Sequence, residues 1–411
     1  MTVHEVADHE GCVHALRQQH LRQSLYDAAA LMMEHVLVNL HGDAHRQRRL
    51  VESGVFRKDV FLRYEKAILP RTLDETLAPY VAAGGGDLVD IGYRIMMNLT
   101  VDFAGIDRPL RTAEETGELL ALLKDFSLAP ALGQSLEADI EPRRRRIRDA
   151  MARFDAQFLQ PSLRRRRALL AEHDAGRAAP DGLPSEGLPT DVLMALVSGQ
   201  QRLQMTELQL VQEGIFYMLA GAHTTIHSLT HAVHEILEWV AASPENAAEL
   251  RENPFFVQRC VYESVRLHPS SPVARRRALE PVELAGGQAV AAGDEVVINL
   301  RAANRSAALF GAAPTRFDPH REIAGGVLPY GLSMGHGMHA CLGRNLAIGV
   351  EPKPGADPAE HQYGVVPLIV AALLRRGIGR DPADAPSRDE TITRVTWSRY
   401  PIVFRPHAAL L

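Results

Sequence analysis

The chain has 411 residues, of which 46% are hydrophobic and 6% aromatic, and its formal net charge is −5. This length permits one large fold or two domains, and the composition suits a helical globular protein with an ample core. The acidic balance argues against nucleic-acid binding, which requires an excess of lysine and arginine on one face.

Cysteine usage and hydropathy indicate the compartment. The cysteines at 12, 260 and 341 are too few and too scattered for a disulfide framework, which favours a reducing environment. The N-terminal residues form no apolar run of signal-peptide length, and no apolar window is long enough to span a membrane. We therefore expect a soluble, cytoplasmic protein with no membrane partner.

Helical periodicity predominates from about residue 20 to residue 270 and returns at about 340–376. The longest predicted helix runs from Thr206, a candidate N-cap, to Trp239, and Pro244 stops it. The expected fold class is therefore mainly α with a minor β region.

The minor β region is expected at about 280–300 and 391–404. Short β-branched runs predict hairpins around 286–287 and 291–294. The segments 391–397 and 401–404 predict a further strand pair.

Three histidines follow one face of the longest predicted helix. His223, His227 and His231 are spaced by four residues, so they could hold a metal ion. Polar packing or a proton path is the competing interpretation, and the lack of an acidic residue on this face before Glu235 favours it.

The segment 328–347 places Cys341 among glycines and directly before a predicted helix start. A thiol at a helix start faces unpaired N–H groups and the positive end of the helix dipole, which lower its pKa. Cys341 is therefore a candidate thiolate ligand for a metal. Two alternatives stay open, a buried apolar cysteine and a zinc site formed by His336, His339 and Cys341.

The segment 334–343 reads Met-Gly-His-Gly-Met-His-Ala-Cys-Leu-Gly. It resembles the haem-binding loop of cytochrome P450 at every position except the first, where Met334 replaces an aromatic residue. The resemblance implies that Cys341 is the axial thiolate ligand of haem b, an iron protoporphyrin, and that Gly335 and His339 belong to the haem-binding residues. A thiolate ligand favours O–O bond cleavage.

Two further motifs of this family concern the haem carboxylates. Residues 42–49 match Gly-x-x-His-x-x-x-Arg, and the resemblance implies that His45 and Arg49 bind haem propionates. Arg276, with Arg277 as the second choice, stands where the family places another propionate-binding cation. Such pairs form strong, charge-assisted hydrogen bonds.

A third group of motifs concerns the fold. Glu263 and Arg266 lie three residues apart on one helical face, and Pro269 completes the family pattern Glu-x-x-Arg-x-x-Pro. Arg321, in segment 317–321, matches the family arginine that joins this pair. The resemblance implies that Glu263, Arg266 and Arg321 form a buried structural triad, in which the second arginine supplies the hydrogen bonds that offset desolvation.

The middle of the long helix, residues 220–225, reads Ala-Gly-Ala-His-Thr-Thr, and the family has an acid at the histidine position. The resemblance implies that Thr224 and His223 are catalytic and deliver protons to dioxygen. Since imidazole titrates near ~6.5, we expect His223 to carry protons around neutral pH. The candidate substrate-pocket residues are Phe216, Ala220, Ser271, Pro272 and Val273.

The resemblance implies a single haem domain over residues 1–411 with the cytochrome P450 fold. It also implies a soluble bacterial-type haem-thiolate monooxygenase. It would activate dioxygen and hydroxylate or epoxidise a small, largely apolar organic molecule, with electrons from a separate ferredoxin-type donor. The alternatives are a haem-binding or sensor protein, and an atypical member that is peroxide-driven or non-oxygenating, because Met334 and His223 depart from the family pattern.

The two ends of the chain also depart from that pattern. His45 comes much earlier than in typical members, so we expect a shortened N-terminus whose strands and first helix are reduced or absent. Pro352 and Pro354 interrupt the helix after Cys341, and we expect a loop over 351–364 to replace part of it.

Overall fold

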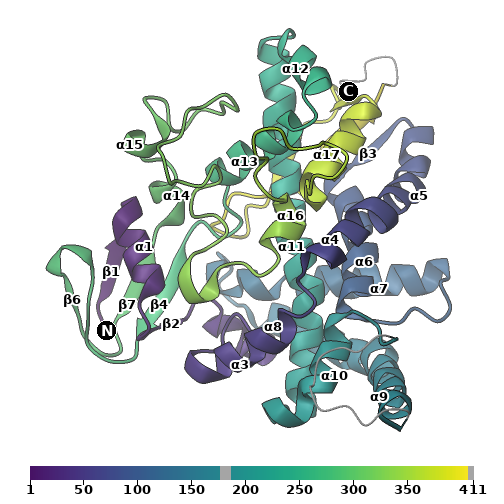
Figure 1. Ribbon diagram of the computed structural model, residues 1–411, viewed down its shortest axis with the longest axis vertical. Coiled ribbons are helices and arrows are strands. Elements are labelled where there is room, and N and C mark those ends of the chain that lie inside the picture. The colour runs from purple at the N-terminus through teal and green to yellow at the C-terminus, as the bar shows by residue number, and fades with distance from the viewer. Residues whose placement is uncertain (176–186, 406–411) are drawn as a thin grey trace.

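The computed structural model describes residues 1–175 and 187–405 and shows many helices with four small sheets (Figure 1). The α-helices are α1 (His9–Arg17), α2 (Ala30–Met33), α3 (Gly42–Glu52), α4 (Lys58–Arg63), α5 (Leu69–Ala82), α6 (Leu88–Ala104), α7 (Ala113–Phe126), α8 (Glu141–Phe154), α9 (Gln160–Ala175), α10 (Val192–Leu203), α11 (Glu207–Ala242), α12 (Asn246–Glu252), α13 (Phe256–Leu267), α14 (Leu300–Ala303), α15 (Ala307–Phe310), α16 (Arg344–Ile348) and α17 (Val365–Arg375). The expectation of a mainly helical fold is confirmed.

The strands are short and lie far apart in the sequence. They are β1 (Val3–Val6), β2 (Leu21–Gln23), β3 (Gly85–Asp87), β4 (Ala274–Ala278), β5 (Val282–Glu283), β6 (Ala289–Val290), β7 (Glu295–Ile298), β8 (Ile378–Arg380), β9 (Ser387–Arg388), β10 (Trp397–Arg399) and β11 (Pro401–Phe404).

Helix α11 is 36 residues long and runs through the middle of the molecule (Figure 1). The side chain of Thr206 accepts a hydrogen bond from the Gln209 N–H at 3.3 Å, and the Gln209 side chain accepts one from the Thr206 N–H at 3.0 Å. This capping box fixes the start of the helix. The predicted N-cap is confirmed, and the helix ends at Ala242, just before Pro244.

The main hydrophobic core surrounds α11. Helix α11 packs along α6, α13 and α17, and most of its side chains between Leu210 and Ile236 are buried. A smaller core lies under the N-terminal sheet, where α1 packs against β1 and β7. The long helix is therefore held on several sides, so its middle turns can serve as a fixed wall of a site.

The N-terminal strands and first helix, which were expected to be reduced or absent, are present as a four-residue β1, a nine-residue α1 and a three-residue β2. Strand β1 pairs in parallel with β7, and β2 pairs antiparallel with β4, giving a sheet with the order β1-β7-β4-β2. Helix α1 connects the two N-terminal strands. The polar residues Glu5, Arg22 and Gln23 hid these strands in the sequence, because both strands are short and pair with segments more than 250 positions away.

The predicted hairpins are confirmed only in part. Strands β5 and β6 pair around Gly286 and Gly287. The turn at 291–294 leads into β7, but β7 pairs with β4 and β1 instead of β6. At the C-terminus, β10 pairs with β9, whereas β11 pairs with β3 and β8, so 391–397 and 401–404 are not partners. Alternation of polar and apolar residues predicts a strand, but it does not identify the strand with which that segment pairs.

The predicted loop after Cys341 is confirmed. Helix α16 ends at Ile348, Gly349 adopts a φ of 75°, and α17 begins only at Val365. Glu65 accepts hydrogen bonds from the N–H groups of Tyr363 and Gly364 at 3.0 and 2.9 Å, which ties the end of the loop to the helical core. Across the described ranges, we find no helix with the length and hydropathy of a membrane span.

Candidate functional site

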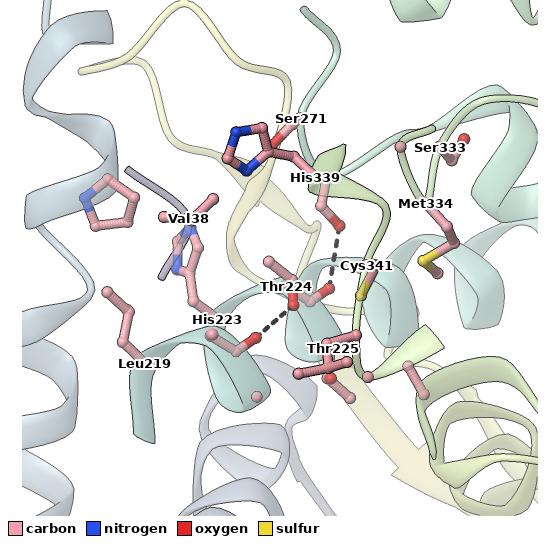
Figure 2. Close-up of a pocket in the computed structure, with 18 of the residues that line it drawn as sticks. Val38, Leu219, His223, Thr224, Thr225, Ser271, Ser333, Met334, His339 and Cys341 are labelled. Carbon is pink, nitrogen blue, oxygen red and sulfur yellow. Dashed lines mark hydrogen bonds between the residues drawn. The ribbon is translucent and has the colours of Figure 1, made fainter. Parts of the chain in front are cut away.

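A cavity of about 360 Å³ lies between the middle of α11 and the loop before α16. Figure 2 shows His223, Thr224 and Thr225 on the helix and Met334, His339 and Cys341 on the loop, all facing this space. Most of its wall is apolar, with Leu99, Phe103 and Phe216 among the lining side chains. The predicted sites on the two segments therefore meet in one place.

Cys341 is held at the cavity by its backbone. Its N–H donates a hydrogen bond to the Met334 carbonyl at 2.8 Å, and its side chain is exposed toward the cavity, whereas Cys12 and Cys260 are buried. Gly335, with a φ of 69°, allows the loop to fold back, and a Cβ there would stand 3.1 Å from the His339 carbonyl. The loop thus presents one sulfur to the cavity.

The expected thiolate is not favoured by the protein alone. Burial raises the pKa of the Cys341 thiol, while the Gly343 N–H and the charge of Arg49 act in the opposite direction. Helix α16 spans only five residues, so its dipole is short. The prediction of a lowered pKa was wrong, because the sequence does not show how deeply the sulfur lies. A bound cation would be needed to keep the thiolate.

Four basic side chains predicted from separate motifs gather at the same cavity. The rings of His45 and His339 stand edge to face with centroids 4.5 Å apart. Arg49 donates to the Ala340 carbonyl at 2.9 Å, and Arg276 donates to the Arg275 carbonyl at 3.0 Å and to the Gln23 side chain. All four line the cavity.

The neighbouring arginine of strand β4 points elsewhere. Arg277 donates to the Gly293 carbonyl at 3.3 Å, and it does not line the cavity in the described structure. Alternation along the strand separates Arg276 from Arg277, so the first choice of the two is the one that faces the cavity.

Among the described residues, no acidic side chain pairs with these basic groups. The buried Nε2 atoms of His45 and His339 have no hydrogen-bond partner among the described residues. Burial, together with the neighbouring cations, lowers the pKa of His45 to about 4 and that of His339 to about 3. Burial also lowers the pKa of Arg276 to about 10. Anionic groups placed here would give the unpaired nitrogen atoms a hydrogen-bond partner and would neutralise the buried positive charge of Arg276.

On the long helix, Thr224 presents its hydroxyl group at the cavity. Its Oγ1 donates to the Ala220 carbonyl at 2.7 Å, and its own carbonyl accepts bonds from Ser228 Oγ at 3.0 Å and Ser270 Oγ at 3.2 Å. Ser270, which the sequence analysis did not identify, therefore contacts this turn of α11. The Oγ1 atom of Thr224 can accept a hydrogen bond from the cavity while its own hydrogen binds the Ala220 carbonyl.

Gly221 has a packing reason of its own. A Cβ at this position would stand 2.7 Å from the Cγ2 atom of Thr100 on α6, which is closer than carbon atoms approach. The glycine therefore allows α6 and α11 to pack closely, in addition to lining the cavity.

His223 is bound by an arginine that the sequence did not indicate. Its Nε2 accepts a hydrogen bond from Nη2 of Arg394, whose Nη1 donates to the Ser270 carbonyl at 2.9 Å. Burial and the charge of Arg394 lower the pKa of His223 to about 3. The expectation that His223 titrates near neutral pH was therefore wrong. Sequence patterns could not place Arg394, because it lies between β9 and β10 and reaches the cavity only through the fold.

The predicted pocket residues are placed as expected except for one. Phe216, Ala220, Ser271 and Val273 line the cavity. Pro272 is not among the lining residues of the described chain, and its carbonyl instead accepts the Arg301 N–H at 3.0 Å. The chain bends at residues 270–272, and within this bend Pro272 turns away from the cavity.

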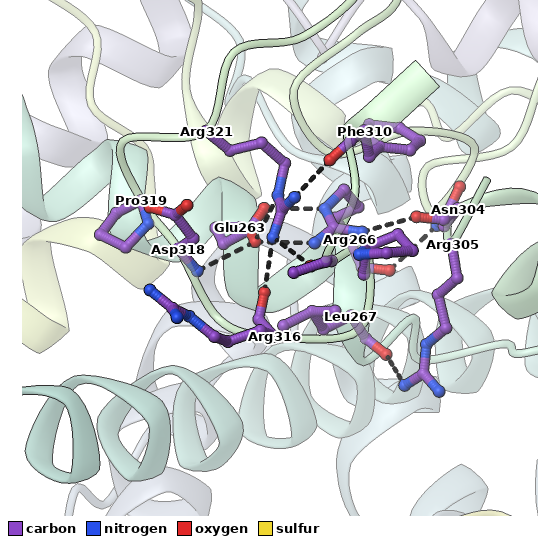
Figure 3. Close-up of polar contacts among 12 residues, drawn as sticks. Glu263, Arg266, Leu267, Asn304, Arg305, Phe310, Arg316, Asp318, Pro319 and Arg321 are labelled. Atoms are coloured by element: carbon purple, nitrogen blue, oxygen red, sulfur yellow. Dashed lines mark hydrogen bonds and ion pairs between the residues drawn. The ribbon is translucent and has the colours of Figure 1, made fainter. Parts of the chain in front are cut away.

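The predicted structural triad forms as expected (Figure 3). Arg266 makes two bonds of 2.7 Å to the carboxylate of Glu263, and Arg321 Nε lies 3.1 Å from the same carboxylate. Arg266 also donates to the carbonyls of Asn304 and Pro314 at 2.6 and 2.8 Å. All three side chains are buried, and this buried charge is well supplied with hydrogen bonds.

The histidine row of α11 binds protein groups. His227 lies 3.3 Å from Thr396 Oγ1, and His231 lies 3.3 Å from the Val395 carbonyl. His336, the other zinc candidate, accepts a bond of 2.8 Å from Arg17. Among the described residues, no three His, Cys, Asp or Glu side chains are grouped as metal ligands. The geometry therefore supports polar packing for the row and gives the zinc alternative no support.

A cysteine sulfur facing a helix across an apolar cavity, with buried basic groups beside it, is the arrangement of a haem-thiolate site. A family model described as cytochrome P450 matches residues 88–349, which is more than half of the chain. The chain belongs to the cytochrome P450 family, whose members bind haem through a cysteine thiolate.

Relatives and solved structures agree with this assignment. The chain is 35% identical over 165 residues to the mycinamicin VIII C21 methyl hydroxylase of Micromonospora griseorubida, covering 40% of this chain and 39% of that protein. It is 36% identical over 161 residues to the nocardicin C N-oxygenase of Nocardia uniformis subsp. tsuyamanensis, covering 39% and 38%. These matches span less than half of either relative.

The fold likeness extends over almost the whole chain. The crystal structure of CalO2 matches with a TM-score of 0.73 at 22% identity, covering 98% of this chain and 90% of that one. P450BioI, in complex with hexadec-9Z-enoic acid ligated acyl carrier protein, matches with a TM-score of 0.71 at 19% identity, covering 98% and 92%. At these identities the likeness concerns the fold.

Proposed function

We propose that this protein is a haem-thiolate monooxygenase that activates dioxygen and inserts one oxygen atom into a C–H or C=C bond of a small, largely apolar organic molecule. The observation that carries the proposal is that Cys341 and Thr224 face one largely apolar cavity from opposite elements. The second oxygen atom leaves as water, which requires two electrons and two protons. A separate ferredoxin-type donor is the proposed source of electrons.

The residues around the cavity fit a haem. We propose that Cys341 would hold the haem iron through its sulfur and that Arg49, Arg276, His45 and His339 would hold the haem propionates, with Gly335 shaping the loop. The support is chemical: these buried basic groups lack acidic partners, and two of their nitrogen atoms have no partner among the described residues. When bound, a thiolate-ligated haem supplies the reductive activation of dioxygen.

Thr224 and His223 are the proposed proton-handling residues. Because Nε2 of His223 accepts a bond from Arg394, the proton of the neutral imidazole is assigned to Nδ1. His223 then acts as a fixed hydrogen-bond donor through Nδ1, and it does not change its charge near neutral pH. Thr224 can pass a proton through its hydroxyl while its carbonyl stays bound to Ser228 and Ser270.

The remaining parts of the proposal follow from the whole chain. We propose that residues 1–411 form a single haem domain, and that Glu263, Arg266 and Arg321 keep its fold. We also propose a cytoplasmic location, because the three cysteines are free and disulfides are rare in that compartment.

One experiment tests the haem-thiolate site directly. The reduced, CO-treated protein is expected to show the thiolate-specific absorption band, and Cys341→Ser is expected to abolish it. Cys12→Ala and Cys260→Ala serve as controls that should keep the band, because both thiols are buried away from the cavity. A persistent band in Cys341→Ser would refute the ligand assignment. Substrate-dependent consumption of dioxygen then separates an oxygenase from a haem-binding or sensor protein.

The position of His223 favours one alternative, an atypical member driven by peroxide. The family acid is absent, and the low pKa of His223 prevents it from supplying a proton by titration at neutral pH. Hydrogen peroxide is dioxygen that already carries two electrons and two protons, so a peroxide-driven reaction needs no separate electron donor. Product formation with hydrogen peroxide, compared with product formation with dioxygen and a reduced ferredoxin, decides between the two.

A further inference from the structure

Three arginines line the cavity, and no aspartate or glutamate of the described chain does. Arg49 and Arg276 lie with His45 and His339, where the proposed function places the two carboxylates of haem. Arg394 lies elsewhere, beside His223 on α11. The two haem carboxylates would pair with Arg49 and Arg276. Arg394 would then remain in the cavity without a negative partner among the described residues.

Arg394 is built into the cavity wall. It is 7% exposed, Nη1 donates to the Ser270 carbonyl at 2.9 Å, and Nη2 donates to His223. These two bonds hold the guanidinium plane in place. Its Nε is buried and has no hydrogen-bond partner among the described residues. The Nε–H group therefore remains unpaired in the described part of the chain.

Neither protein partner of Arg394 carries a negative charge. Ser270 offers a carbonyl and His223 a neutral ring nitrogen. Asp389, the carboxylate on the same segment that acts on Arg394 electrostatically, accepts bonds from the N–H and Oγ1 of Thr391 at 2.9 and 2.5 Å. No ion pair to Arg394 is found within the described ranges. A buried cation without a counter-charge is costly, so the site favours an anion.

We propose that the substrate is a largely apolar carboxylic acid and that Arg394 binds its carboxylate. This inference rests on the proposed function and names the substrate class of the same cavity. The apolar wall, with Leu99, Phe103 and Phe216, suits the hydrocarbon part. Arg394 anchors the charged end and fixes which carbon atoms lie beside Thr224, on the α11 side of the cavity, so Arg394 is a specificity-determining residue.

The test compares acids with neutral analogues of the same shape. Decanoate and decanamide form one pair, and 4-phenylbutyrate and 4-phenylbutyramide form a second pair with a different apolar part. Binding to the haem-loaded protein is measured by calorimetry and by the shift of the iron spin state. Because a hydrogen bond to a charged group contributes more than a neutral one, at least one acid should bind roughly tenfold or more tightly than its amide.

Arg394→Gln should remove this preference and leave the affinity for the amide nearly unchanged. Arg394→Lys keeps the charge and should restore part of the preference. Arg388→Gln is the matched control, since Arg388 is an exposed arginine of the same segment that lies over Trp397. It should preserve the wild-type preference.

Several outcomes would overturn the inference. They are equal binding of acid and amide by the wild-type protein, absence of binding by either acid at millimolar concentration, and a preference that persists in Arg394→Gln. Loss of haem from Arg394→Gln, without a change in the acid preference, would assign Arg394 to the haem instead. The CO spectrum is recorded for every variant. If the wild-type protein lacks the thiolate band, the proposed function itself has failed.

Discussion

At the scale of single residues, Thr224 is the clearest candidate for moving a proton. Thr224→Ala removes the hydroxyl but keeps the helix, because Oγ1 bonds only the Ala220 carbonyl of the same turn. We expect unchanged haem loading and a shift of electrons from product toward hydrogen peroxide. The measurement is product and peroxide formed per electron donor consumed.

Thr230→Ala is the matched control for this prediction. Thr230 makes the same kind of bond, from Oγ1 to the Ile226 carbonyl at 2.9 Å, but it is buried away from the cavity. Its replacement should lower stability without changing the ratio of product to peroxide. Equal ratios in Thr224→Ala and the wild-type protein would remove Thr224 from the proton path.

At the scale of elements, the contact between α6 and α11 depends on one missing methyl group. Gly221→Ala gains about 1 kcal/mol of helix propensity but places a Cβ 2.7 Å from Thr100 Cγ2. Overpacking costs roughly 1–3 kcal/mol, so we expect a net loss of stability. Thr100→Ser deletes Cγ2 and keeps the hydroxyl that bonds the Met96 carbonyl.

A double-mutant cycle measures this contact. In the Thr100→Ser background, Gly221→Ala should become neutral or stabilising in chemical unfolding experiments. If the cost of Gly221→Ala is the same in both backgrounds, the two helices do not meet through these atoms, and the glycine serves the cavity alone.

The triad joins α13 to the segment around Arg321 and yields a second prediction at this scale. Arg266→Ala leaves the buried carboxylate of Glu263 with one arginine instead of two, at a cost of roughly 3–5 kcal/mol. We expect low yields of soluble, haem-loaded protein. Arg71→Ala is the control, since Arg71 pairs with Glu75 at 2.7 Å on the surface of α5. A stable, fully loaded Arg266→Ala protein would contradict the assigned role.

Some elements and site residues could be predicted from the sequence because their signals are local. The N-cap at Thr206, the Cys341 loop and the spacing of Glu263 and Arg266 each depend on a few neighbouring residues, and the structure places them as expected. Arg394 has no such signal, since it reaches the cavity only because β9 and β10 pair there. The lowered pKa of His223 depends on its burial and on that same arginine, and neither is visible in the sequence.

At the scale of the whole molecule, the C-terminal segment lies along the histidine row of α11, and this contact should make stability depend on pH. His231 bonds the Val395 carbonyl at 3.3 Å, and its ring stacks on His268 at 4.2 Å. Burial, with the charge of His268 as the next cause, lowers the pKa of His231 from 6.5 to about 2. A group whose pKa is lowered on folding takes up its proton in the unfolded chain first.

Other buried groups act in the opposite direction, so the contribution of His231 must be isolated. Burial raises the pKa of both Glu65 and Glu213 to about 7, so these carboxyl groups bind protons more readily in the folded state and gain stability as the pH falls. The net slope of the wild-type protein is the sum of both effects. Only a comparison with a variant that lacks the imidazole separates them.

His231→Gln supplies that comparison, because its amide can still donate to the Val395 carbonyl but does not titrate. At pH 8 the imidazole is neutral in both states, so the difference in unfolding free energy there gives the cost of the substitution alone. As the pH falls from 6.5 to 5, the wild-type protein should lose roughly 1–2 kcal/mol relative to the variant, since each pKa unit corresponds to about 1.4 kcal/mol. Urea unfolding of the haem-loaded proteins, followed by circular dichroism at both pH values, measures this loss. Parallel curves would mean that His231 binds its proton equally in the folded and unfolded chain, and that the segment does not shield it.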